Sequence, residues 1–208
     1  MKNTTPKEAI EKLVEGNRRF TTGLVSVETL LSKSKMSELA QKGQRPFAIV
    51  LTCSDSRSPV EMIFDQGLGD IFVVRVAGNV VAPSLLASIE FAAANFGSAT
   101  VVVLGHTQCG AVNAALQQFR HPETPLPSAH LEELISRIRP AVDSVVHKKG
   151  ASAPNLMDAA IVANILRSRE LILEQSKIVS SLVSEGKLSV EPAILDISTG
   201  SVRFLEVH

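Results

Sequence analysis

Two short polar segments hold the residues of this sequence that can carry out chemistry. The first contains Cys53, Asp55 and Arg57, and the second contains His106 and Cys109. Two thiols, an imidazole and a carboxylate form a tetrahedral donor set that suits Zn²⁺, a borderline-soft ion that accepts all three ligand types. Because the donors within each segment are close in sequence, each pair can reach one ion without a long loop. The sequence therefore predicts one zinc ion per chain, bound by these two thiols, the imidazole and the carboxylate.

The roles of Asp55 and Arg57 leave two versions of this site open. If Asp55 is the fourth ligand, the site is closed, and closed zinc sites are the structural kind. If the Arg57 guanidinium instead holds Asp55 in a bidentate pair, the fourth position is left for water. Zinc then lowers the pKa of that water and makes hydroxide near neutral pH, which Asp55 can orient toward an electrophile. We expect falling pH to favour the closed version, so activity should rise on the alkaline side.

Each polar segment follows a short apolar run with the composition of a buried strand. The runs cover residues 47–51 and 100–104, and both are rich in β-branched residues. Such runs are typical of parallel strands that are buried on both faces. Because open α/β sheets bind ligands at the carboxyl ends of their strands, we expect the two polar segments to meet at one edge of a sheet.

The alternation of strand and helix patterns predicts an α/β fold with a central, mostly parallel β-sheet flanked by helices. Strands are expected over 46–53, 71–76, 100–104, 188–190, 193–197 and 202–207, the last two forming a hairpin that makes the closing strands antiparallel. Helices are expected over 5–20, 27–42, 60–64, 83–96, from Gly110 onward, around 131–142 and over 153–185. Pro140 should kink or split the sixth of these helices, and the last has a weak point at 168–170.

Two amphipathic helices precede the first strand and form a helical N-terminal arm. Thr5, Pro6 and Glu8 give the first helix a capping box with a proline in its first turn. Gly43 is a natural end for the second helix. Such an arm needs an apolar surface to cover, and the sheet of its own chain is one candidate.

Composition and charge indicate one domain and exclude several classes of partner. With 208 residues, of which 45% are hydrophobic, the chain can bury a substantial core. We interpret residues 1–208 as a single domain, with the arm at 1–44 and an α/β core at 45–208. The 21 basic and 21 acidic residues balance, which gives no electrostatic case for nucleic acid or an anionic membrane. Without a signal-peptide pattern or an apolar stretch of about 18 residues, we expect a cytoplasmic protein with reduced cysteines.

The two polar segments resemble those of the β-class carbonic anhydrases of bacterial type. The resemblance rests on Cys53-Ser54-Asp55-Ser56-Arg57 followed by Gly105-His106-Thr107-Gln108-Cys109-Gly110. It extends through residues 64–75, 77–79, 88–92 and 186–188, and it covers nearly the whole chain from Gly16 onward. What it implies is a carbonate dehydratase, which hydrates CO₂ reversibly to bicarbonate and a proton.

The resemblance also implies roles for individual residues. Cys53, His106 and Cys109 would be the zinc ligands, and Asp55 with Arg57 would be a gating pair. In that family the CO₂ pocket is completed across a dimer interface, so we expect self-association as a dimer or a higher homo-oligomer. The helical arm would then cover the partner subunit.

Four further residues are expected to bind the substrate. By the resemblance, Gln44 and Phe72 line the CO₂ pocket. Gly110 begins a helix directly after a ligand, so its N-terminal amides should favour an anion such as bicarbonate. Phe91 stands where the family often has tyrosine, so a hydroxyl group near the pocket is missing.

Three classes of function remain open from the sequence. The first is the hydration of CO₂. The second keeps the zinc site but hydrolyses a related linear molecule such as carbonyl sulfide or carbon disulfide, because the pocket needs only a small apolar electrophile. The third is a zinc-stabilised binding or scaffold protein, in which Asp55 stays on the metal.

Overall fold

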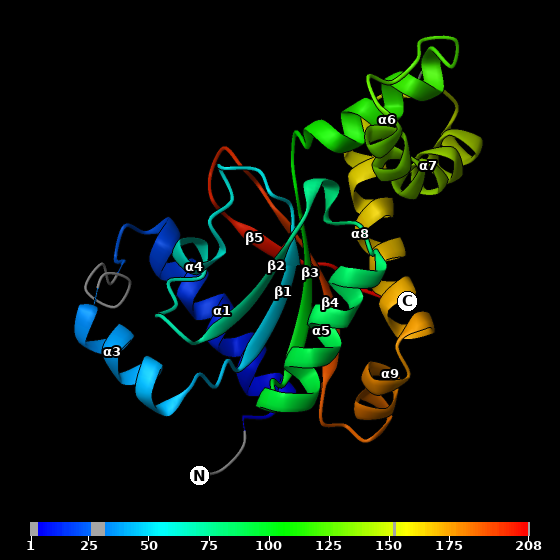
Figure 1. The fold of residues 1–208 in the computed structure, drawn as a ribbon. Coiled ribbons are helices and arrows are strands. Elements are labelled where there is room, and N and C mark those ends of the chain that lie inside the picture. The colour runs from blue at the N-terminus through cyan, green and yellow to red at the C-terminus, as the bar shows by residue number, and fades with distance from the viewer. Residues whose placement is uncertain (1–3, 26–31, 152, 208) are drawn as a thin grey trace.

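The computed structural model describes residues 4–25, 32–151 and 153–207, which fold around one central sheet (Figure 1). The described strands are β1 (Ala48–Thr52), β2 (Ile71–Arg75), β3 (Thr100–His106), β4 (Ser189–Leu195) and β5 (Val202–Phe204). They form a sheet in the order β2-β1-β3-β4-β5. The first four strands are parallel, and β5 is antiparallel to β4. The predicted α/β fold with a mostly parallel sheet is therefore confirmed.

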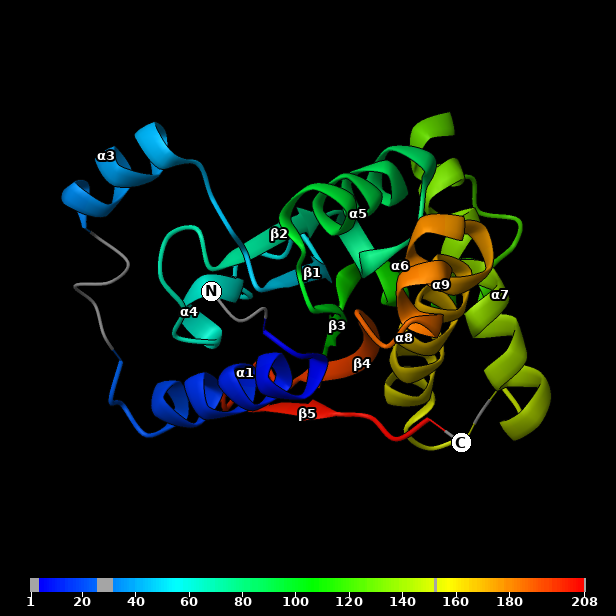
Figure 2. The ribbon, with the colours of Figure 1, turned by 90° about the horizontal axis from the view of Figure 1, so that it is seen from below.

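Helices cover both faces of this sheet. They are α1 (Pro6–Thr21), α3 (Lys33–Lys42), α4 (Val60–Ile63), α5 (Pro83–Phe96), α6 (Gly110–Arg120), α7 (Ala129–Lys149), α8 (Leu156–Gln175) and α9 (Lys177–Ser184). A 3-10 turn, η1, covers Ala77–Asn79. Seen from below, α1 lies along one face of the sheet and α5 along the other (Figure 2). The helices α6 and α7 project beyond the sheet, next to α8 (Figure 1).

Strand β1 is buried along its whole length because both of its faces meet helices. Ala48 and Val50 belong to the cluster that packs against Leu13 of α1. Ile49 and Leu51 alternate with them and belong to the larger cluster on the side of α5 and α8. This two-sided burial explains why the strand lacks the polar alternation of a half-exposed sheet.

The first helix has the predicted capping box and packs one face on the sheet of its own chain. The Glu8 backbone N–H donates to Thr5 Oγ1 at 3.3 Å, and the Thr5 N–H donates to a Glu8 carboxylate oxygen at 2.8 Å. Ala9 and Leu13 are fully buried against the sheet of their own chain. The buried stripe of α1 therefore packs on the sheet of its own chain, and the coverage of a partner subunit by the arm stays a prediction.

The second helix of the arm is shorter in the structure than the predicted 27–42. Ser32 caps it, since its hydroxyl accepts from the Lys35 N–H at 3.2 Å, and α3 begins at Lys33. The predicted start at Val27 lies outside the described residues. No side chain of α3 is buried, although Leu39 lies against Gly69. The surface of this helix is thus largely uncovered in a single chain.

The later helices differ from the predictions at two points. The break in the predicted helix 153–185 lies at Ser176 rather than at 168–170, because Ser176 caps α9. Its hydroxyl accepts from the Val179 N–H at 3.1 Å and donates to Glu90 Oε1 at 2.6 Å. Pro140 does not split α7, which continues through it. Because Pro140 is exposed while Ile138 and Val142 are buried, the packed face of the helix stays continuous.

The two strands predicted over 188–190 and 193–197 form the single strand β4. Pro192 lies inside it, opposite Val103 of β3. Its carbonyl accepts from the Leu205 N–H at 2.8 Å, just beyond the end of β5. The N–H that proline lacks would face this same side, at the end of the ladder with β5, so the parallel pairing of β4 with β3 is not interrupted.

Candidate active site

The sheet order brings the two polar segments together. Strand β1 connects to β2 on one side, whereas β3 lies on the other side of β1. The chain therefore changes direction at the carboxyl ends of β1 and β3, which is where open α/β sheets bind ligands. Cys53 follows β1 directly, and His106 is the last residue of β3.

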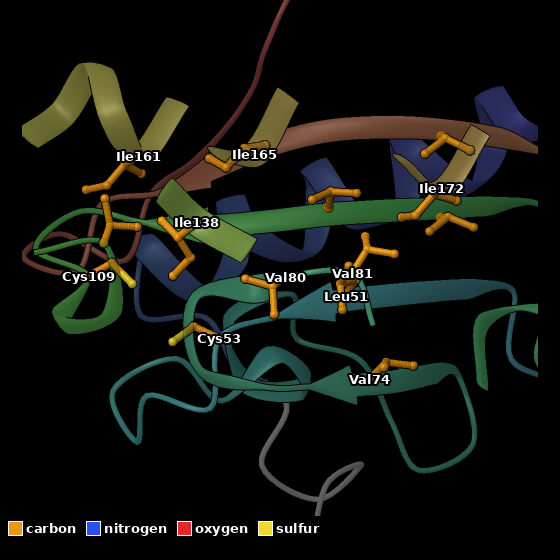
Figure 3. Close-up of a cluster of buried hydrophobic side chains, with 14 of the residues drawn as sticks. Leu51, Cys53, Val74, Val80, Val81, Cys109, Ile138, Ile161, Ile165 and Ile172 are labelled. Carbon is orange, nitrogen blue, oxygen red and sulfur yellow. The ribbon is translucent and has the colours of Figure 1, made fainter. Parts of the chain in front are cut away.

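Three buried donor atoms converge at this point. The sulfur atoms of Cys53 and Cys109 and a ring nitrogen of His106 all lie within 4.8 Å of one another. Figure 3 shows both cysteines at the same end of the main hydrophobic cluster. The His106 Nδ1–H donates to the Thr107 carbonyl at 2.8 Å, while Nε2 is buried without a hydrogen-bond partner. A buried imidazole nitrogen of this kind, beside two thiols, fits a Zn²⁺ ion.

Hydrogen bonds distribute charge unequally between the two sulfur atoms. The neighbouring Cys109 thiol is the main reason that the pKa of Cys53 is lowered to about 4. The Gly78 N–H also donates to Cys53 Sγ, at 3.3 Å. The Cys53 sulfur, together with burial, raises the pKa of Cys109. Binding of a metal ion would displace the proton of the Cys109 thiol.

Asp55 and Arg57 adopt the bidentate arrangement. Arg57 Nε donates to Asp55 Oδ1 at 2.9 Å and Arg57 Nη2 donates to Oδ2 at 2.7 Å, while the Arg57 backbone N–H adds a 2.9 Å bond to Oδ1. The Arg57 guanidinium holds the pKa of the Asp55 carboxyl well below its usual range. Asp55 Oδ2 lies 3.9 Å from His106 Nε2. The carboxylate is therefore next to the three donors but is turned toward Arg57.

Arg75 holds the backbone that carries these groups. Its Nε donates to the Cys53 carbonyl at 3.2 Å and its Nη2 donates to the Asp55 carbonyl at 2.7 Å. The sequence analysis did not assign Arg75 a partner. Neither the spacing of the residues nor their types identifies backbone carbonyls as that partner.

Sequence reasoning also missed two groups behind the metal site, Gly78 and Asn164. Gly78 has φ of 72° and Asn79 has φ of 45°, so both residues are in the left-handed region. A Gly-Asn pair is a recognisable turn signal, but the contact with Cys53 depends on the fold. Asn164 lies in the middle of α8 and donates to the Gly78 carbonyl at 2.8 Å. Nothing in the helical pattern distinguishes it from other polar positions.

The four expected substrate-binding residues lie in different places. Gly110 begins α6 beside Cys109, and a Cβ atom there would meet nothing within 4 Å. Phe72 pairs with Ile49, near the amino ends of β1 and β2. Phe91 is 55% exposed on α5, and its ring packs edge-on against Phe96 at 5.6 Å between centroids. Gln44 precedes β1, whose opposite end leads to Cys53, so a single chain does not bring Gln44 to its own metal site.

Comparisons with known proteins agree with this geometry. The sequence model of the carbonic anhydrase family matches residues 48–202. Carbonic anhydrase 2 of Mycobacterium tuberculosis is 35% identical over 200 residues, which cover 96% of this chain and 93% of the relative. This chain belongs to the β-carbonic anhydrase family. It is a carbonate dehydratase that catalyses the hydration of CO₂, with a zinc site at Cys53, His106 and Cys109.

Solved structures place the chain in the same class. The structure of the β-carbonic anhydrase CcaA superimposes with a TM-score of 0.75 at 25% identity, covering 95% of both chains. One of two β-carbonic anhydrases of Sordaria macrospora, described as tetrameric, superimposes with a TM-score of 0.74 at 24% identity and covers 85% of this chain and 88% of that one. Among the described helices of the present carbonic anhydrase, none is both long and apolar enough to cross a membrane.

Proposed function

We propose that Asp55 and Arg57 act as a gate for the hydration of CO₂ at the Cys53-His106-Cys109 site. The observation that carries this proposal is the bidentate pair between the Arg57 guanidinium and both oxygens of Asp55. A carboxylate held in this way is not free to become a fourth metal ligand. The fourth position of a tetrahedral site then stays open, as catalytic zinc sites require.

Each residue of the site has a distinct task in this proposal. When bound, zinc supplies a Lewis acid that lowers the pKa of a water molecule in its open position. Asp55 stays ionised because of Arg57, so it accepts a hydrogen bond from the attacking water and orients a lone pair toward the carbon of CO₂. The amides at the start of α6, beyond Gly110, favour the anionic product. Arg75 fixes the Cys53 and Asp55 carbonyls and thereby the direction of the Asp55 side chain.

The test of the gate is the substitution Arg57→Ala, with zinc content and CO₂ hydration measured on the same protein. We expect zinc to be retained, because Arg57 is not a ligand, and the hydration rate to fall by about 100-fold or more, as for loss of a positioned proton acceptor. The matched control is Arg18→Ala, which breaks another exposed bidentate pair, with Glu15 on α1.

Two results would contradict the gate. Undiminished hydration by Arg57→Ala would show that the guanidinium does not control Asp55. Full zinc without CO₂ turnover in the unmodified enzyme would point instead to the sulfur-containing substrates or to a scaffold role.

The organisation of the chain supports self-association. Residues 1–208 would form one domain in which the arm at 1–44 lies against the core at 45–208 and contributes to a partner. Four apolar side chains in this part of the chain remain exposed. They are Val14 on α1, Leu24 after α1, Met36 on α3 and Met62 on α4. In this proposal a second copy covers them, and Gln44 and Phe72 help to line a pocket that two subunits share. A reducing compartment such as the cytoplasm would keep Cys53 and Cys109 available as ligands.

Mixing two inactive variants tests whether the pocket is shared. Gln44→Ala removes the side chain that would reach a partner's site, and Arg57→Ala removes the gate within the same chain. In a mixed dimer, one site combines the intact Arg57 of one chain with the intact Gln44 of the other. Activity should therefore return after the two variants exchange subunits. A monomer in sedimentation that is fully active, or no recovery in mixed dimers, would contradict the shared pocket.

A further inference from the structure

Asn164 is a buried polar residue that lies behind the metal site without touching it. Its side chain is almost completely buried in the middle of α8. The Nδ2 group donates to the Gly78 carbonyl at 2.8 Å, a bond that joins α8 to the turn η1. The N–H of the same residue, Gly78, donates to Cys53 Sγ at 3.3 Å. Gly78 therefore links the two residues: its carbonyl is bound by Asn164, and its N–H is bound to the zinc ligand Cys53.

The turn that joins them has little freedom of its own. Gly78 and Asn79 both have positive φ, a conformation that costs free energy for Asn79 and suits Gly78. A Cβ atom at Gly78 would lie 2.7 Å from Ile138 Cδ1 and 3.1 Å from Ala111 Cβ. The packing of α6 and α7 thus sets where the turn lies. Among the described side chains, Asn164 alone donates a hydrogen bond to the Gly78 carbonyl, so this bond sets the orientation of the peptide between Gly78 and Asn79.

The orientation of Gly78 matters because its N–H reaches a sulfur that binds the metal. A hydrogen bond to a thiolate withdraws charge from the sulfur and reduces the charge that the sulfur donates to the ion. Groups that hold metal ligands from outside commonly change metal affinity by about 10- to 100-fold when they are removed.

We propose that Asn164 is a positioning residue for the zinc ligand Cys53, acting by holding the Gly78 N–H against the Cys53 sulfur. Without the Asn164 side chain, the Gly78 carbonyl loses its buried partner, the backbone at Gly78 can rotate, and the Gly78 N–H can move away from the sulfur. Cys53 then becomes a more strongly donating thiolate in a less rigid position. This inference rests on the zinc site of the proposed function, but it does not depend on the gate formed by Asp55 and Arg57.

The test compares Asn164 with another buried asparagine, Asn17. Asn17 donates to the carbonyls of Ile63 and Gly200, at 3.0 and 2.8 Å, on the opposite face of the sheet. Substitution of either asparagine removes bonds to backbone carbonyls and should lower the stability of the fold. Only substitution of Asn164 should alter the metal site. Asn164→Leu keeps the branched shape of the asparagine side chain without its polar atoms, and Asn164→Ala is the second variant in case one of them does not fold.

Two readouts are made on enzyme loaded with cobalt(II) or zinc. In the Asn164 variants the thiolate-to-cobalt charge-transfer band should move to longer wavelength, because the Cys53 sulfur has lost a hydrogen-bond donor. Competition with a chelator should show zinc affinity lowered by about 10-fold. Asn17→Ala and Asn17→Leu should leave both quantities at their original values despite their lower stability.

The outcomes separate this inference from the zinc site itself. Folded Asn164 variants with an unchanged band and unchanged zinc affinity would overturn the positioning role and leave the site intact. Equal changes in the Asn17 variants would also overturn it, because the effect would then follow from stability alone. Unmodified enzyme that bound neither cobalt nor zinc would overturn the metal site and the positioning role together.

Discussion

Gly16 and Gly110 are two glycines of this chain with very different surroundings. A Cβ atom on Gly16 would overlap the Phe64 carbonyl oxygen and would lie 2.7 Å from Gln66 Nε2. Because the Phe64 oxygen belongs to the backbone, α1 would have to move away from α4 to make room. At Gly110 nothing lies within 4 Å of the same added atom. Glycine is thus required at the first position by close approach, and not at the second.

We therefore expect Gly16→Ala and Gly110→Ala to differ in stability. Gly16→Ala should lower the free energy of unfolding by about 1–3 kcal/mol, as for other overpacked sites, whereas Gly110→Ala should change it by no more than about 0.5 kcal/mol. Urea unfolding of both variants measures the difference. Equal stability of the two would mean that α1 can shift on the sheet without cost.

At the scale of elements, one face of α1 is held by the sheet of its own chain. Leu13 is fully buried in the cluster that contains Val50 and Leu104, whereas its neighbour Val14 is 50% exposed. Asn17 adds hydrogen bonds to Ile63 and Gly200 and accepts from the Val202 N–H at 2.9 Å. One face of the helix therefore stabilises the fold, and the other is available to a second copy.

Alanine substitutions on the two faces of α1 should separate folding from association. Leu13→Ala should lower the free energy of unfolding by about 2–5 kcal/mol, because it leaves a cavity beneath the helix. Val14→Ala should change the stability of the single chain by less than about 0.5 kcal/mol and weaken self-association in sedimentation. A small effect of Leu13→Ala would show that α1 does not depend on this contact.

At the scale of the whole enzyme, the proposed mechanism predicts a pH dependence with a definite sign. The attacking water must lose a proton, and two thiolates donate more charge to zinc than imidazoles do. The hydration rate should therefore climb as the pH rises from about 6.5 to 9, measured by stopped flow on protein of known zinc content. Arg57 lowers the pKa of Asp55, so this carboxylate is charged throughout and its titration cannot produce the rise. A rate that is flat or falls with pH would contradict the mechanism.

The sequence could predict the features that depend on local pattern. Buried parallel strands have no polar alternation, so the apolar runs before Cys53 and His106 identified β1 and β3. Their carboxyl ends then identified the edge of the sheet that holds the site. The types and spacing of the ligands then identified zinc. The capping box of α1 was also predictable, because all of its contacts lie within one helical turn. The break at Ser176 was not, since the Ser176 hydroxyl also bonds to Glu90 on α5.

The sequence by itself determined the mostly parallel α/β fold and the donor set of Cys53, His106 and Cys109, because periodicity and ligand chemistry are properties of neighbouring residues. Only the tertiary structure decided that Asp55 faces Arg57, with Arg75 fixing the intervening backbone. It alone decided that α1 covers its own sheet. The physical reason is the same in each case. A side chain often has several compatible partners, and the distances between segments of the folded chain decide which one it takes. The sequence does not contain those distances.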